Sequence, residues 1–167
     1  MEPLEDAVDH LRGSSSSPLI VEYGDYECPY SRLAYRQIQR VERQTSIRFA
    51  FRHFPLTTIH PHALAAAAAA EAAHRQLRFW DMHDLLFHRQ KALDDDDLRA
   101  YASELGLDVE RFDTDRGSDD LGARIARDVE SGRTSGEVNG TPTLFIDGVV
   151  YRGSYEADDL LEALAGR

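Results

Sequence analysis

The sequence predicts an α/β domain in which a strand–helix–strand unit and a strand–strand–helix unit flank a long helical block. The first unit spans residues 18–60, where two apolar, β-forming runs enclose a helical pattern. The block spans residues 61–135, about 75 residues with no strand pattern. The last unit spans residues 136–167 and contains an Asp-Gly hairpin motif. Because 167 residues suit one domain, residues 18–167 are assigned to a single domain.

Residues 1–17 are expected to form a flexible arm before this domain. The first ten residues are acidic and polar, and they lack the basic and apolar regions of a secretory signal. The run Gly13–Ser17 has the composition of a flexible linker.

The sequence of the first unit predicts two strands joined by a helix. The apolar run Leu19–Tyr23 breaks at Gly24, which is typical of a buried strand. Apolar residues then recur at helical spacing after Pro29, which suits the first helical position because its missing N–H costs nothing there. Residues 47–52 alternate as in a second strand. This order favours a right-handed parallel unit.

The block and the last unit also follow local patterns. The alanine-rich run that starts at His62 consists almost entirely of strong helix formers. Asp94–Asp97 have the wrong spacing for a calcium loop, so they are assigned to a solvated helix N-terminus. Asp147-Gly148 between apolar β-formers predicts a tight hairpin. A closing helix follows, with Ser154 as its expected N-cap.

Cys28, the only cysteine in the chain, is the clearest candidate for chemistry. With Pro29 at the first helical position, Cys28 is the N-cap, and its sulfur faces the unpaired N–H groups of Tyr30 and Ser31. The positive end of the helix dipole there favours the thiolate, although acidic neighbours oppose it. The alternative is an inert buried cysteine, which a Cys-Pro corner between strand and helix fits poorly.

These motifs together resemble the DsbA-like branch of the thioredoxin superfamily, including the thioredoxin-like domains fused to some sodium/proton antiporters. The matching stretches are "VEYGDYECPYS" (21–31), "FRHFPL" (51–56), "FWDMHDLLF" (79–87) and "NGTPTLFIDG" (139–148). The resemblance covers about residues 18–166, which is nearly the whole chain. It implies the thioredoxin fold with an inserted all-helical block, and thiol–disulfide chemistry.

The resemblance also implies roles for individual residues. Cys28 matches the attacking cysteine, and Glu22 matches the acidic residue behind the family's cysteine pair, where it assists proton movement; an exposed strand carboxylate is the alternative. Pro142 matches the superfamily's cis-proline, whose loop pairs with an extended substrate by strand addition. The expected substrate-binding residues are Pro29, Tyr30, Thr141 and Pro142.

Ser31 stands where the family has its resolving cysteine. It cannot form a disulfide with Cys28, so the chain cannot carry two oxidising equivalents by itself. Monothiol chemistry remains, in which the Cys28 thiolate forms a mixed disulfide that an external thiol such as glutathione resolves. We count Ser31 with Cys28 and Glu22 as a catalytic candidate, because its hydroxyl is expected to hydrogen-bond the thiolate.

Two other functions fit the same residues. A redox-inactive peptide-binding or regulatory module would keep the fold and the groove without cycling. A glutathione-dependent transferase or isomerase would share the helical insertion, but such enzymes usually place serine at the first motif position, where this chain has Cys28.

Composition limits the partners. Acidic residues outnumber Lys and Arg by 30 to 19, and the net charge of −11 argues against nucleic acid. No apolar run is long enough for membrane insertion. One cysteine and no secretory signal favour the cytoplasm. We expect protein or small-molecule thiols and disulfides as partners, no bound cofactor beyond glutathione as co-substrate, and no metal, because His60 and His62 lack an identifiable third ligand.

Overall fold

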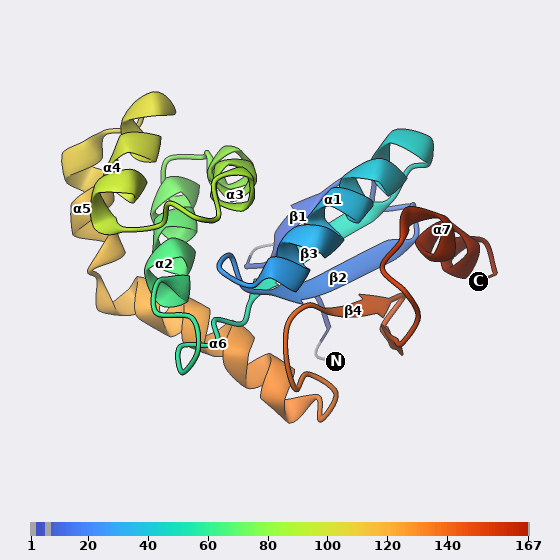
Figure 1. The fold of residues 1–167 in the computed structure, drawn as a ribbon. Helices are drawn as coiled ribbons and strands as arrows, with labels where there is room; N and C mark the ends of the chain where they lie inside the picture. The colour runs from blue at the N-terminus through green and yellow to red at the C-terminus, as the bar shows by residue number, and fades with distance from the viewer. Residues whose placement is uncertain (1–2, 6–7, 167) are drawn as a thin grey trace.

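A five-stranded sheet forms the centre of the molecule in the computed structural model, which describes residues 3–5 and 8–166 (Figure 1). Its strand order is β1-β3-β2-β4-β5. β2 (Leu19–Gly24) and β3 (Arg48–His53) are parallel and joined by α1 (Pro29–Gln44), whereas β4 (Thr143–Ile146) and β5 (Val149–Tyr151) are antiparallel. The α/β order predicted from the sequence is confirmed.

The segment between β3 and β4 is helical in the described chain. Its helices are α2 (Ala63–His74), α3 (Phe79–His88), α4 (Asp95–Glu104), α5 (Val109–Arg116) and α6 (Asp119–Thr134). A capping box between Asp94 and Asp97 opens α4, so the aspartate run lies at a helix N-terminus as predicted. Within the described residues, no helix has both the length and the apolar character needed to cross a lipid bilayer.

The two faces of the sheet carry separate apolar clusters because side chains alternate along each strand. Ile20 of β2 belongs to the larger cluster, which includes residues of α1 and of α7 (Ala157–Ala165). Val21 and Tyr23 belong to the smaller cluster on the other face, where α6 packs against β3. In Figure 1, α6 runs from the helical block to a position below the sheet. The block is thereby fixed to the strands that carry the candidate site.

The β4–β5 hairpin has the tight turn that its sequence predicts. Asp147 and Gly148 have φ values of 47° and 83°, both in the left-handed region that a two-residue hairpin of this kind requires. The expected N-cap of the last helix is displaced by two residues. Glu156 is the N-cap of α7, and Ser154 instead accepts the Glu156 N–H through its hydroxyl (3.1 Å).

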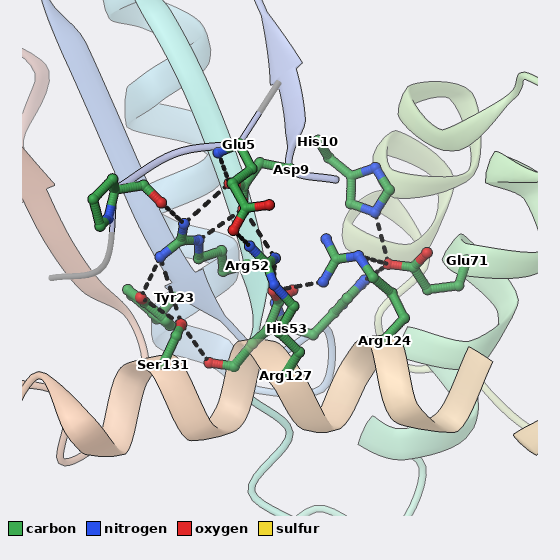
Figure 2. A network of polar contacts seen from close by, with 12 residues as sticks. Glu5, Asp9, His10, Tyr23, Arg52, His53, Glu71, Arg124, Arg127 and Ser131 are labelled. Atoms are coloured by element: carbon green, nitrogen blue, oxygen red, sulfur yellow. Dashed lines mark hydrogen bonds and ion pairs between the residues drawn. The ribbon is translucent and has the colours of Figure 1, made fainter. Parts of the chain in front are cut away.

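Part of the segment expected to be a flexible arm, residues 1–17, lies in the sheet instead. His10–Arg12 form β1 and pair antiparallel with β3. The carboxylate of Asp9 accepts hydrogen bonds of 2.8 and 3.0 Å from Arg52, and neither side chain is exposed (Figure 2). A buried guanidinium needs a counter-charge, and this acidic segment supplies it. Residues 1, 2, 6 and 7 of the expected arm, and residue 167 of the expected domain, lie outside the described residues.

Candidate active site

Cys28 lies at the corner where the chain leaves β2 and enters α1. It is the N-cap of α1 with an extended backbone (φ −72°, ψ 121°), and Pro29 occupies the first helical position, as the sequence predicts. The side chain is buried, with 3% of its surface exposed. Its thiol donates to the carbonyl of Thr141 (3.2 Å), although 113 residues separate the two in sequence. The fold therefore brings the predicted nucleophile against the loop that precedes β4.

That loop contains the Thr141–Pro142 peptide bond, which is cis. Pro142 is buried, and its carbonyl accepts a hydrogen bond from the Tyr155 hydroxyl (2.9 Å). Burial raises the pKa of Tyr155, and the nearby charges of Glu22 and Cys28 raise it further. Tyr155 is thus a member of the site that sequence reasoning missed, because nothing in its local pattern distinguishes it from a residue that leads into a helix.

Ser31 is buried under the turn, but its contact differs from the one expected. Its hydroxyl accepts the backbone N–H of Asp25 (3.2 Å), rather than forming a hydrogen bond with the sulfur of Cys28. Asp25 is in turn buried, and its carboxylate accepts the N–H of Leu56 and pairs with His60 Nδ1, both at 2.8 Å. Ser31 therefore supports the backbone of the turn through Asp25.

Glu22 lies on the central strand, on the sheet face that α1 covers. It is 1% exposed, and among the described residues neither of its carboxylate oxygens has a hydrogen-bond partner. Burial raises its pKa to about 8, although the charge of Arg12 partly opposes this shift. Gly24 makes room for this arrangement, because a Cβ there would meet the Phe51 ring at 2.4 Å and Glu22 Oε1 at 3.0 Å. Because its pKa is about 8, the Glu22 carboxyl is mostly protonated at neutral pH.

The outer side of the turn faces solvent. Pro29 and Tyr30 are exposed, and Tyr30 presents 67% of its surface. A cavity of about 450 Å³ lies beside the turn, between Glu27 and the segment that enters α4. Gln90 lines this cavity, and its side-chain amide donates to the carbonyls of Tyr26 (2.7 Å) and Cys28 (2.8 Å). Sequence reasoning missed Gln90 because no pattern links it to a turn about 60 residues earlier.

A second polar cluster, formed by His10, His53 and Glu71, has the residue types of a metal site. The three side chains are buried, and their potential ligand atoms lie within 4.8 Å of one another. His10 Nε2 and His53 Nε2 lie 2.6 and 2.9 Å from the same Glu71 oxygen (Figure 2). Burial lowers the pKa of His10 to about 4, so at neutral pH His10 is a neutral donor to Glu71. Arg124, 3.9 Å from that oxygen, already supplies the positive charge that a metal ion would bring.

Sequence comparison links the chain to one domain family and to a group of transporters. The family model described as Thioredoxin matches residues 5–165. The Na(+)/H(+) antiporter NhaA 1 of Salinispora arenicola (strain CNS-205) is 45% identical over 167 residues, which are 98% of this chain and 25% of the antiporter. The Na(+)/H(+) antiporter NhaA of Herminiimonas arsenicoxydans is 42% identical over 158 residues, again 25% of its length. The chain thus spans about a quarter of these curated relatives.

Solved structures give the same fold. A thioredoxin-like oxidoreductase from Silicibacter pomeroyi DSS-3 superimposes with a TM-score of 0.85 and 26% identity, covering 96% of this chain and 92% of that one. The thiol-disulfide exchange protein alpha-DsbA2 from Wolbachia pipientis gives a TM-score of 0.84 at 21% identity, covering 96% and 88%. The overall fold thus recurs in DsbA-like proteins, and the chain belongs to the thioredoxin family.

Proposed function

We propose that this domain is a monothiol thiol–disulfide oxidoreductase that acts through a mixed disulfide at Cys28. Its fold is that of thiol–disulfide oxidoreductases. The observation that carries the proposal is the placement of Cys28, which is the N-cap residue of α1 and whose thiol lies against the Thr141 carbonyl. Unpaired N–H groups at that position stabilise a thiolate, which is the reactive form.

The reaction has two exchange steps. The Cys28 thiolate attacks one sulfur of a partner disulfide, a new S–S bond forms, and the other sulfur leaves as a thiolate that takes up a proton. The thiolate of an external thiol such as glutathione then attacks the mixed disulfide and releases Cys28. With a glutathionylated protein as partner, the net reaction converts the mixed disulfide and one glutathione into a protein thiol and oxidised glutathione. Because the second thiol comes from outside, the proposal places the domain in a reducing cytoplasm.

Glu22 and the surface around Cys28 have separate parts in this scheme. A carboxyl with a pKa of about 8 both holds and releases a proton near neutral pH, which suits the proton movement that the resemblance implies for Glu22. The backbone of Thr141, once its carbonyl is freed from the thiol, would pair with an extended partner, and Tyr30 would contact it from the exposed side of the turn.

The proposal is tested by following glutathione-coupled reduction of a glutathionylated peptide. We expect turnover by the parent chain, none by Cys28→Ser, and retained turnover by Ser31→Ala, because the hydroxyl supports the turn without entering the exchange. The pH profile of Cys28 alkylation is measured in parallel. Absence of Cys28-dependent turnover, together with alkylation that follows an ordinary cysteine, would overturn the proposal.

A second candidate is a redox-inactive peptide-binding or regulatory module. Two observations favour it: Cys28 is only 3% exposed, and the relatives that match this chain over a quarter of their length are named as antiporters. This candidate predicts that binding of a partner survives Cys28→Ser unchanged, whereas the oxidoreductase predicts that capture of the partner as a mixed disulfide is lost.

A further inference from the structure

We propose that Gln90 is a positioning residue that holds the Cys28 turn in its reactive geometry. The inference rests on the proposed function, since it concerns the reactivity of Cys28. Gln90 is half-buried and lies two residues beyond α3, in the helical block rather than in the sheet. Its Nε2 donates to the carbonyl of Tyr26 at 2.7 Å and to the carbonyl of Cys28 at 2.8 Å. The Gln90 amide therefore links the helical block to the two residues that flank Glu27 in the turn.

The hydrogen bond from Gln90 to the Cys28 carbonyl also affects the start of α1. This carbonyl also accepts the N–H of Arg32 (3.2 Å), which is the first hydrogen bond of α1. Gln90 thus binds the same oxygen that closes the first helical turn. A turn held in this way fixes the start of α1, where the first N–H groups have no acceptor within the helix; the Cys28 side chain makes no capping hydrogen bond to them.

The Gln90 hydrogen bond also favours the Cys28 thiolate electrostatically. The Cys28 carbonyl oxygen carries a partial negative charge on the same residue as the sulfur, and this charge opposes a thiolate. An N–H donor placed on the oxygen offsets that charge, so the Gln90 contact favours the thiolate. A glutamate at the position would act at neutral pH only as an acceptor and would repel both carbonyls.

Gln76 provides a matched control in the same block. It is also half-buried and follows a helix, and its side chain clamps the backbone of Asp108 by donating to the carbonyl (3.1 Å) and accepting from the N–H (2.9 Å). Replacing Gln76 therefore removes side-chain hydrogen bonds to the backbone, as replacing Gln90 does, but in a loop that is not part of the Cys28 turn.

The experiment compares Gln90→Met and Gln76→Met in the full chain. Methionine keeps the length and flexibility of glutamine and removes its donors. The rate of Cys28 alkylation by iodoacetamide is measured between pH 5 and 9, with the thermal unfolding midpoint of each variant. We expect Gln90→Met to slow alkylation near pH 6 by about threefold to tenfold, the range of one or two lost hydrogen bonds, and to move the profile to higher pH. Gln76→Met should lower the unfolding midpoint and leave the profile unchanged.

Two results would overturn the inference: a Gln90→Met profile that matches the parent, or an equal slowing in both variants. If Gln90→Met does not fold, Gln90→Glu replaces it and should slow alkylation at least as much. Alkylation consumes Cys28 once and requires no turnover. A parent chain without glutathione-coupled turnover but with the predicted Gln90 effect would therefore defeat the proposed function alone, and an active parent with an unchanged Gln90→Met profile would defeat this inference alone.

Discussion

Glu22 shows how one buried side chain links the site to stability. Its pKa rises from 4.5 to about 8 because the carboxylate loses its hydration inside the sheet and gains no hydrogen bond in return. An acid whose folded pKa is raised favours the folded state at low pH. That advantage is lost as the pH rises from about 4.5 to about 8, because the unfolded chain releases the proton first.

The substitution Glu22→Gln tests whether burial of the Glu22 carboxyl makes stability depend on pH in this way. Glutamine imitates the protonated carboxyl at every pH, so the variant should be more stable than the parent at pH 7 by about 3 kcal/mol and nearly equal to it at pH 4. Urea unfolding across this pH range measures the difference. Glu162→Gln, at an exposed position, serves as the control and should change stability by less than about 0.5 kcal/mol. An unchanged pH dependence in Glu22→Gln would contradict the assignment.

Ser31→Cys tests whether the turn keeps the geometry of a two-cysteine site. The serine occupies the third helical position after the N-cap, the position at which the resemblance implies a second cysteine. We expect the oxidised variant to contain a disulfide between Cys28 and the introduced thiol, and to show no free thiol in a denaturing assay. Loss of the Ser31–Asp25 contact should cost about 1 kcal/mol in the reduced form. Two free thiols after complete oxidation would show that the turn is unsuited to the bond.

At the scale of elements, the sequence predicts features that depend on near neighbours. Pro29 marks the start of α1, Asp147-Gly148 marks the hairpin, and both are where local chemistry places them. β1 was missed because it has three residues, is polar in part, and precedes a glycine–serine run. Its strand character comes from pairing with β3, which no local pattern records.

The candidate site divides in the same way. Cys28 and the proline of the Thr141 loop were predicted because they belong to motifs. The positions of Tyr155 and Gln90, and the contact of Ser31 with Asp25, were not, because each depends on hydrogen bonds between segments distant in sequence or on the exact direction of a small side chain.

α2 is an element whose small side chains let other helices approach closely. Several of its alanines are fully buried, and α2 contacts α3, α5 and α6. Ala70→Leu should therefore overpack the block and destabilise the protein by about 1–3 kcal/mol in urea unfolding. Ala126→Leu, at an exposed position of α6, should change stability by less than about 0.5 kcal/mol. Equal effects of the two substitutions would show that the packing of α2 is loose.

For the whole molecule, the Asp9–Arg52 pair joins the N-terminal segment to the centre of the sheet. Both side chains are fully buried. Asp9→Ala should cost about 3–5 kcal/mol, because it removes a buried carboxylate that pairs with the buried Arg52 guanidinium. The exposed pair of Arg89 and Glu104 gives a control, since Glu104→Ala should cost less than about 1 kcal/mol. A loss at Asp9 as small as that at Glu104 would mean that the segment contributes little to folding.

The position of β1 also protects the molecule from its own copies. β3 has six residues, and one of its edges is covered by β1. A chain shortened to begin at Pro18, where composition alone would place the start of the domain, would present the bare backbone of β3 to solvent. Unpaired strand edges of this kind recruit strands from other molecules. The short N-terminal strand therefore protects this edge from pairing with other molecules, and its removal should increase self-association.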